Sequence, residues 1–485
     1  MTQIETILKN QGPLLSGQLA EILMKNGAVS KDAARKQIER AKSPVYKIQG
    51  FFTDNQSFLY LEEQYQKEAF FQGLRTAFSL AAKRCSAIVS LMDYHYGFID
   101  SAHAPAYSFS PIKKLVGHKL FNGVIQQLQM LNVVSQDESF YRLHPDLMDY
   151  SVVNLTKYKA VETAKNFVLA QFNSWARSIG LISYNTAQYY SEFSKFQWAF
   201  TAPSYIKSLT RYERDKLVPA FVLADILIGK EATEQDVSFF VEKVLIVTSQ
   251  RNSSKILPFL IVESVTPEAL KKLKENGIVV AFVNKLFGME YQQLLQSLIN
   301  TVTNAGAILK KNPEAYLELI QKLNRLVDGK TNNLRGDLFE LAVGYYHSRQ
   351  CQSLDLGKRI LFQGFPKEID VMAIYHDRIV VSECKGYKSL LSLSVVEEWV
   401  KEKVPFVRDW ILDQRPYEGK PIVFQLWSTG GFDTQALEYL LHISSRTKKY
   451  RIEFFDQEQI KIKAKETGSK KFTEILQQYY FGEDL

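Results

Sequence analysis

Residues 367–385 decide the fold of this chain and read KEIDVMAIYHDRIVVSECK. Two apolar runs with the composition of β-strands lie in this stretch, and a two-residue loop separates them. A loop of that length predicts an antiparallel hairpin in which Asp370 faces Glu383. Because side chains alternate along a strand, Lys385 shares a face with Glu383. Two carboxylates and one ammonium group are therefore expected together at one end of the hairpin.

Both faces of this hairpin are apolar, which predicts strands in the middle of a sheet that is covered on both sides. The apolar side chains are those of Val371, Met372, Ala373, Ile374, Ile379, Val380 and Val381. Facing carboxylates at the end of a core hairpin repel each other and lose hydration, at a cost of several kcal/mol unless a positive charge compensates them. A divalent cation such as Mg²⁺, which binds through one or two carboxylates, would compensate them. A salt bridge at the end of a strand is the alternative.

The same residues resemble the motif of the PD-(D/E)xK nuclease superfamily, which has the restriction-endonuclease-like fold. Asp370 matches the aspartate of that motif, and Glu383 and Lys385 match its Glu-x-Lys. Ile369 stands where the superfamily often has proline. The resemblance covers about residues 331–455 and implies an α/β/α sandwich with a mixed central sheet, which we assign to residues 331–485.

A predicted helix upstream resembles the first helix of the superfamily. It opens with RGDLFE at residues 335–340, where a glutamate follows a Gly-x-x-Phe pattern, and Glu340 is the matching residue. Asp337 competes for that role, and favourable charge at a helix N-terminus is its alternative function. The order of the predicted elements also agrees with the superfamily. These elements are helix 334–347, strand 359–362, the hairpin, helix 395–412, strand 421–427, helix 434–445 and strand 450–455.

This resemblance implies a chemistry for the site. Asp370 and Glu383 would hold Mg²⁺, for which Mn²⁺ could substitute, and the backbone carbonyl of Cys384 would be a further ligand. Lys385 would position or deprotonate the attacking water, and Glu340 would serve a second metal ion or the water network. These residues would act together in the hydrolysis of phosphodiester bonds in DNA.

The composition of the chain sets wider limits. Its 485 residues predict about two to four domains. The formal charge of +8 and the pI of about 9.0 suit a polyanionic partner. Cys85, Cys351 and Cys384 form no CxxC pair, and the sequence has neither a signal-peptide pattern nor an apolar run of membrane-spanning length. We therefore expect a cytoplasmic protein without disulfides, and the lack of a GxxxxGK(S/T) loop predicts that this chain does not hydrolyse ATP by a P-loop.

Residues 1–64 predict three helices and a two-stranded wing, and they resemble a winged helix-turn-helix. The third predicted helix starts after Ser30 and is the most basic segment of this region. Its basic residues are Lys31, Arg35, Lys36 and Arg40. In that family the third helix enters the major groove, so these residues are the expected DNA contacts. A solvated helix face and a winged helix used for protein contacts are the alternatives.

Residues 65–150 predict a helical segment that includes a second winged-helix-like unit. Its expected elements are a long helix at 66–90, a helix at 120–131 and a hairpin at 133–143. Residues 301–330 predict a helical connector, and the charged tail beyond residue 461 is expected to be loosely attached.

Residues 155–300 predict a central α/β domain whose order of helices and strands repeats that of residues 331–455. Asp225 and Glu263 are present there, but Val265 stands where a lysine would follow the glutamate. The segment is therefore interpreted as a degenerate nuclease-like domain that lacks the catalytic set. A generic α/β module is the alternative, because alternating helices and strands are common.

The fold class expected for the whole chain is multidomain α/β, and the expected function is that of a metal-dependent DNA endonuclease. The combination with a winged helix suggests a restriction or phage-defence enzyme, or a repair or recombination nuclease, by analogy of fold. The expected partners are DNA, a second copy of the chain in a homodimer, and a partner ATPase or other defence-system subunit. A non-enzymatic DNA-binding regulator or assembly protein that keeps the nuclease fold is the rival hypothesis, and RNA cleavage is a third.

Overall fold

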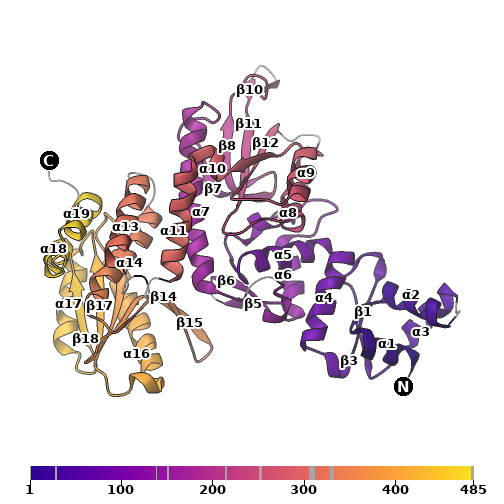
Figure 1. Ribbon diagram of the computed structural model, residues 1–485, viewed down its shortest axis with the longest axis horizontal. Helices are drawn as coiled ribbons and strands as arrows, with labels where there is room; N and C mark the ends of the chain where they lie inside the picture. The colour runs from indigo at the N-terminus through magenta and orange to yellow at the C-terminus, as the bar shows by residue number, and fades with distance from the viewer. Residues whose placement is uncertain are drawn as a thin grey trace. The chain divides into compact units, whose positions relative to one another are not determined.

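The computed structural model of the protein describes residues 2–27, 30–137, 139–149, 152–213, 216–250, 254–304, 308, 312–327 and 332–481. It divides into two compact units. The first unit is formed by residues 1–158 with 172–286, and the second by residues 159–171 with 287–485. Each unit contains a five-stranded mixed sheet accompanied by helices (Figure 1). The predicted mixed α/β class is therefore confirmed.

The N-terminal region of the first unit has the predicted three helices and paired strands. The elements are α1 (Gln3–Gln11), β1 (Leu14–Leu15), α2 (Ser16–Gly27), α3 (Lys31–Arg40), β2 (Val45–Ile48) and β3 (Phe58–Leu61). The Ser30 hydroxyl caps α3 by accepting a hydrogen bond from the Ala33 amide at 3.3 Å. The strands form a sheet in the order β1-β3-β2. Leu14 and Leu15 pair with β3, which is why α2 begins after them.

The single long helix predicted at 66–90 is wrong. The chain forms α4 (Glu68–Ala81) and α5 (Lys83–Tyr94), separated at Ala82, whose φ of −148° and ψ of 62° are not helical. The break redirects the chain, so that nine of the twelve α5 residues are buried. Neither glycine nor proline marks the break, and the apolar pattern continues through it, so the sequence alone does not reveal it.

The remaining elements of this region agree with the predicted helix and hairpin. They are β4 (Phe98–Asp100), α6 (Phe121–Met130), β5 (Val134–Asp137) and β6 (Phe140–Leu143). The sheet order is β4-β6-β5, so β4 is a strand that the sequence pattern missed. This region shares one apolar core with the central sheet, because Tyr107 packs on Phe239 with ring centroids 6.2 Å apart.

The central sheet has five strands in the order β13-β12-β11-β8-β7. Its strands are β7 (Gln188–Phe193), β8 (Phe196–Ser204), β11 (Ala220–Leu227), β12 (Ile256–Val262) and β13 (Val279–Phe282). Helix α7 (Leu155–Ser178) precedes them, and α8 (Glu234–Thr248) and α9 (Pro267–Glu275) connect the parallel strands. The short hairpin of β9 (Arg211–Glu213) and β10 (Lys216–Val218) was not predicted.

The second unit contains the sheet β14-β15-β16-β17-β18. Its strands are β14 (Ser353–Phe362), β15 (Phe365–Ile374), β16 (Ile379–Lys385), β17 (Ile422–Ser428) and β18 (Arg451–Phe455). Helix α14 (Asn332–Ser348) contacts β14, β15 and β16. A separate apolar cluster joins the sheet to α15 (Leu393–Glu398), α16 (Val404–Asp413) and α17 (Thr434–Arg446). Between α15 and α16 the residues Trp399–Lys403 form a π-helical turn, η5.

Helices that precede and follow this sheet complete the second unit. They are α11 (Met289–Thr303), α13 (Pro313–Val327), α18 (Gln457–Glu466), α19 (Lys470–Leu476) and a final π-helical turn η7 (Gln477–Phe481), while α10 (Val283–Phe287) begins in the first unit. The expected loose tail beyond residue 461 is wrong over residues 462–481, because Phe472, Ile475 and Leu476 are buried, and residues 482–485 lie outside the described part of the chain. The many charged residues of this segment hide the apolar stripe of α19, which packs against the unit.

Arg335 of α14 also fixes this C-terminal segment. Its guanidinium donates hydrogen bonds to the carbonyl oxygens of Tyr479 and Tyr480 at 2.5 and 2.7 Å. Its Nε donates to the carbonyl of Gly386, immediately after β16, at 2.8 Å. A Cβ at Gly386 would lie 2.8 Å from the Arg335 carbonyl oxygen, so only glycine allows this close approach.

The central sheet and the C-terminal sheet have the same topology. In each, the first three strands in chain order are antiparallel neighbours, and the third, fourth and fifth are parallel. A parallel bridge beyond the third and fourth strands also recurs, between Ala232 and Val265 and between Leu391 and Phe432. The repeated order of elements predicted from the sequence is therefore present in the structure.

This correspondence corrects the motif positions that the sequence suggested for Asp225 and Glu263 in the central segment. Leu227 ends the third strand of the central sheet, as Lys385 does in the C-terminal sheet. Their carbonyl oxygens accept hydrogen bonds from the amides of the residues that directly follow the next strand, Glu263 and Thr429, at 3.4 and 3.1 Å respectively. Two residues earlier on each strand stand Asp225 and Glu383. Asp225 therefore occupies the position of the motif glutamate, whereas Glu263 lies beyond the end of β12 and has no motif position.

The other motif positions of the central sheet are apolar. Ala199 lies opposite Asp225 and donates its amide to the Asp225 carboxylate at 2.8 Å. Asp225 forms a fully buried ion pair with Lys243 of α8. The Lys243 ammonium also donates to the carbonyls of Ala106 and Gln197, at 2.6 and 3.0 Å. The Lys243 ammonium therefore has three protein acceptors, one for each of its N–H groups.

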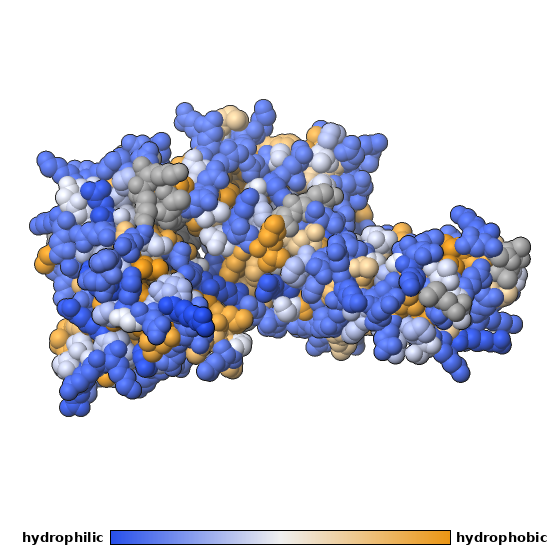
Figure 2. All heavy atoms as spheres, turned by 60° about the horizontal axis from the view of Figure 1, so that its bottom comes forward, coloured by the Kyte–Doolittle hydropathy of each residue, from blue (hydrophilic) through white to orange (hydrophobic). Residues whose placement is uncertain are grey.

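Polar side chains dominate the surface turned to the viewer in Figure 2, with apolar residues in scattered groups between them. Among the described helices, none combines the length and the apolar composition that crossing a membrane requires.

The buried pair of Asp225 and Lys243 gives a test of this packing. Lys243→Met should lower the free energy of unfolding by about 3–5 kcal/mol, because the Asp225 carboxylate would stay buried without its partner. Adding Asp225→Leu should recover part of that loss. Chemical unfolding curves of the two variants measure both effects. A loss below about 1 kcal/mol in the single variant would show that the pair is not buried as described.

Candidate active site

The hairpin of β15 and β16 has the predicted register. Val371 pairs with Ser382, and the ladder continues to Ile374 opposite Ile379. The ladder ends at Val371 and does not include Asp370. The Asp370 carboxylate accepts a hydrogen bond from the Cys384 amide at 2.8 Å. The strands therefore separate where the charged residues begin.

The two carboxylates are buried and close to a lysine, as the spacing predicts. The exposed fractions are 9% for Asp370 and 7% for Glu383. The ammonium nitrogen of Lys385 lies 2.8 Å from Glu383 Oε1. The side chain of Lys385 is 24% exposed, so this edge of the site reaches the surface. The structure thus brings together Asp370, Glu383 and Lys385.

Sequence reasoning missed a second lysine in this site. The ammonium nitrogen of Lys403 forms a hydrogen bond with Glu383 Oε2 and lies 3.4 Å from Asp370 Oδ1. Lys403 is the last residue of the π-helical turn η5. One signal was available, because Lys403 lies seven residues after the buried Val396 and four before the buried Val407, on the apolar side of this helix.

The four charged groups shift one another's pKa values. Burial and the neighbouring Glu383 carboxylate raise the pKa of Asp370 to about 6, against the opposing effect of Lys403. Burial also acts to raise the pKa of Glu383, but Lys403 and Lys385 outweigh it and hold that pKa below its usual value. Burial lowers and the carboxylates raise the pKa of both lysines, with a net rise. Any proton taken up by the pair therefore resides mainly on Asp370.

Glu340 is the remaining acidic residue predicted for this site. It lies on α14 and is half-buried. Together with burial and Asp370 it raises the pKa of the Cys384 thiol, which places it on the β16 side of the helix. Within the ranges that the structure describes, no group of three or more His, Cys, Asp or Glu residues has the arrangement of a metal site. The side chain of Asp337 lies outside the described residues.

The residues present nevertheless fit a divalent cation. The Lys403 ammonium stands between one oxygen of Asp370 and one of Glu383, and this marks a position where a positive charge contacts both carboxylates. Two carboxylates with open water positions match the usual ligand set of Mg²⁺. The Cys384 carbonyl as a third ligand remains a prediction.

A buried polar network holds the hairpin in place. The His347 imidazole of α14 contacts the Tyr375 hydroxyl at 2.8 Å and the Ser382 hydroxyl at 3.0 Å. Ser382 donates in turn to Gln425 of β17 at 3.1 Å. Burial lowers the pKa of His347 to about 3, so the imidazole stays neutral. Because Ser382 precedes Glu383, this network fixes the strand that carries the site.

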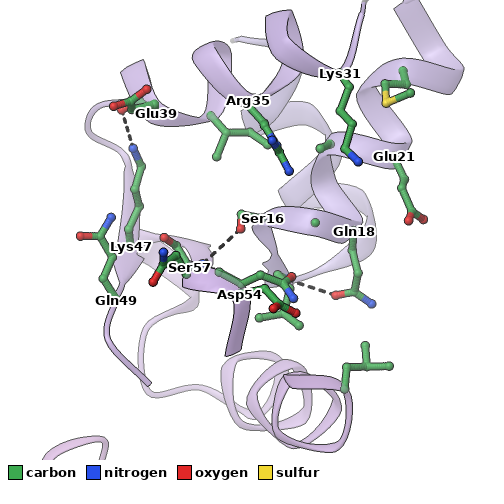
Figure 3. Close-up of a pocket in the computed structure, with 18 residues that line it drawn as sticks. Ser16, Gln18, Glu21, Lys31, Arg35, Glu39, Lys47, Gln49, Asp54 and Ser57 are labelled. Atoms are coloured by element: carbon green, nitrogen blue, oxygen red, sulfur yellow. Dashed lines mark hydrogen bonds between the residues drawn. The ribbon is translucent and has the colours of Figure 1, made fainter. Parts of the chain in front are cut away.

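A second candidate site, here called the α3 groove, lies in the N-terminal region and has a volume of about 940 Å³. Figure 3 shows Lys31 and Arg35 pointing from α3 toward this groove. Lys47 of β2 also lines the groove, and its ammonium donates to the carbonyl of Glu39 of α3 at 2.7 Å. The other lining side chains include the polar or acidic Ser16, Gln18, Glu21, Gln49 and Asp54.

The four basic residues predicted as DNA contacts therefore divide into two groups. Lys31 and Arg35, four residues apart on α3, line the α3 groove. Lys36 and Arg40, also four residues apart, are exposed but do not line it. The helix thus presents two basic stripes rather than one.

Comparisons with known proteins do not assign the site. No protein-family model matches the sequence, and no curated protein matches it. The solved structure of the restriction endonuclease FokI bound to DNA is similar over 62% of this chain and 71% of its own, with 10% identity and a TM-score of 0.17. A likeness at this level carries no argument about fold or function, so the geometry of the site must carry the interpretation.

The raised pKa of Asp370 predicts a pH-dependent stability. Without metal, the folded protein binds a proton more tightly at Asp370 than the unfolded chain does, so stability falls as pH rises from about 3.8 to about 6. Asp370→Asn should remove this loss and raise the stability at pH 8 by up to about 3 kcal/mol. Melting temperatures in EDTA at pH 4.5 and pH 8 measure the difference.

The matched control for this measurement is Asp377→Asn in the exposed hairpin loop. Desolvation acts to raise the pKa of Asp377, but the hydrogen bond and charge of Arg378, the backbone amide of Asp377 and the charge of His376 together outweigh it and lower that pKa, so this variant should not be stabilised at pH 8. An Asp370→Asn protein that melts below wild type at pH 8 would contradict the assignment of an unfavourable charge to Asp370.

Proposed function

We propose that the chain is a metal-dependent DNA endonuclease of the restriction-endonuclease-like fold, with its active site at Asp370, Glu383 and Lys385. The observation that carries this proposal is the meeting of two buried carboxylates and a partly exposed lysine at the end of one hairpin. Mg²⁺ or Mn²⁺ bound there would polarise the scissile phosphate and lower the pKa of a water molecule. The mixed sheet with helices around it supports the same proposal.

The residues of the site have distinct tasks in this proposal. Asp370 and Glu383 bind the cation, and the His347 network keeps the strand that carries Glu383 in place. The side chain of Lys385 is exposed enough to reach a phosphate or the attacking water. Its ion pair with the buried Glu383 carboxylate holds the ammonium group at the site. Glu340 is kept as a candidate for the water network because it lies near β16. Restriction, phage defence, repair and recombination are the biological settings that fit such an enzyme.

Cleavage assays on plasmid, linear and single-stranded DNA and on RNA test the proposal. Asp370→Ala and Lys385→Ala should each lower the Mg²⁺-dependent rate by roughly a thousandfold, which corresponds to about 4 kcal/mol of lost transition-state stabilisation. Asp377→Ala, in the exposed loop of the same hairpin, should keep the wild-type rate. Near wild-type cleavage by either site variant would refute the active-site assignment, and cleavage of RNA alone would change the substrate class.

The rival function is that of a non-enzymatic DNA-binding regulator or assembly protein. The contact of Lys403 with both carboxylates favours it, because four groups of balanced charge could serve as a purely structural cluster. In that case no metal should be required for any activity. A wild-type protein that binds DNA equally well in EDTA and Mg²⁺ and cuts no substrate would support this rival.

For DNA binding, we propose that the N-terminal region acts as a winged helix through α3 and the α3 groove. Lys31 and Arg35 point into a groove large enough to receive a phosphodiester backbone, and Lys47 also lines this groove. Glu21 and Asp54 line the same groove and limit its positive potential. The proposal therefore favours contacts of moderate strength that position DNA, rather than tight capture by charge alone.

Charge reversal on the two basic stripes of α3 tests this proposal. Lys31→Glu with Arg35→Glu should weaken DNA binding and reduce the log–log salt slope by about two units, one for each lost phosphate contact. Lys36→Glu with Arg40→Glu makes the same change of charge on the same helix and should have a smaller effect. Fluorescence anisotropy at several salt concentrations measures both. Equal effects would indicate a general charge effect, and unchanged affinity in both would indicate a protein-contact module.

A further inference from the structure

The site has four charged groups whose formal charges cancel. Asp370 and Glu383 contribute two negative charges, and Lys385 and Lys403 contribute two positive ones. The two lysines are not equivalent, because Lys385 forms an ion pair with Glu383, whereas Lys403 forms ion pairs with both carboxylates. Lys403 therefore stands where a single cation reaches both acidic groups.

A lysine occupies the corresponding position beside the central sheet as well. Lys243 of α8 pairs with Asp225 as Lys403 pairs with Glu383. Lys243 follows the N-cap Thr233 by ten residues, and Lys403 follows the N-cap Ser392 by eleven. The π-helical turn that ends at Lys403 accommodates the additional residue and returns the lysine to the same side of the helix.

The two copies differ in how firmly they hold the lysine. Lys243 is fully buried and has two backbone carbonyls as further acceptors. The side chain of Lys403 is 21% exposed. The Lys403 ammonium can therefore leave its carboxylates for water along the exposed edge, which the Lys243 ammonium cannot do.

We propose that Lys403 is the resident counter-ion of the site and that a divalent cation binds by displacing its ammonium group from Asp370 and Glu383. A divalent cation added beside Lys403 would leave two uncompensated positive charges in a buried site, which is unfavourable. Exchange for Lys403 leaves one net positive charge, which suits an incoming phosphate anion. The inference rests on the metal site of the proposed function but does not depend on any reaction taking place there.

Binding of Mn²⁺ alone, followed by calorimetry and by electron paramagnetic resonance, tests the exchange. Lys403→Met removes the charge at similar length and should tighten Mn²⁺ binding by at least about tenfold, the lower end of the effect of one nearby charge on proton affinity. Its metal-free melting temperature should fall below that of wild type, and saturating Mn²⁺ should raise it by more than it raises the wild-type value.

Two further variants make the result specific. Lys401→Met removes a lysine from the same π-helical turn that is 59% exposed and pairs with Glu397, and it should leave Mn²⁺ affinity unchanged. Lys403→Arg keeps the charge and should not tighten binding, which provides a measurement even if Lys403→Met fails to fold without metal. Unchanged or weaker Mn²⁺ binding by Lys403→Met, or tighter binding by Lys403→Arg, would overturn the proposal. Tighter binding by Lys403→Met without cleavage of any nucleic acid would refute the proposed function and leave the exchange intact.

Discussion

Burial of the Asp370 and Glu383 carboxylates is the constraint on which the C-terminal unit is built. Two anions at the end of a core hairpin are tolerated only with cations beside them, because desolvation and mutual repulsion both oppose their ionisation. Lys385 comes from the same strand as Glu383, and Lys403 comes from the helix that covers the sheet. The neutral His347 network then fixes the strand from the opposite side without adding charge. The surrounding elements thus keep an electrostatically unfavourable arrangement in a defined geometry.

The two sheets show different solutions to the same problem. In the central sheet one carboxylate remains, and a single buried lysine with two carbonyl acceptors satisfies it completely. In the C-terminal sheet a second carboxylate requires a second lysine, and both lysines remain partly exposed. Ala199 and Leu227 replace charged residues in the central copy, which removes both the repulsion and the access to water.

Much of the C-terminal fold could be predicted from the sequence, because it depends on local patterns. The two-residue loop fixed the register of the hairpin, and the register brought Asp370, Glu383 and Lys385 together. Lys403 could not be found from motif spacing, since its contact with the site depends on a π-helical turn that no residue type announces. The break at Ala82 escaped prediction for a similar reason, because burial of α5 decides it rather than any local helix-breaking residue. Asp225 lies on the third strand of the central sheet and not on the second. The sequence pattern missed the edge strand β7, because it has no apolar run.

The hydrogen bonds of Arg335 have a consequence for the order in which the protein is made. This side chain joins the backbone just after Lys385 to the carbonyls of Tyr479 and Tyr480. Ribosomes make chains from the N-terminus at about 5–20 residues per second, so these carbonyls emerge seconds after the hairpin does. During that interval the segment that follows β16 lacks its anchor. In a growing chain, the segment that follows the carboxylate site therefore gains this anchor only after Tyr479 and Tyr480 have been made.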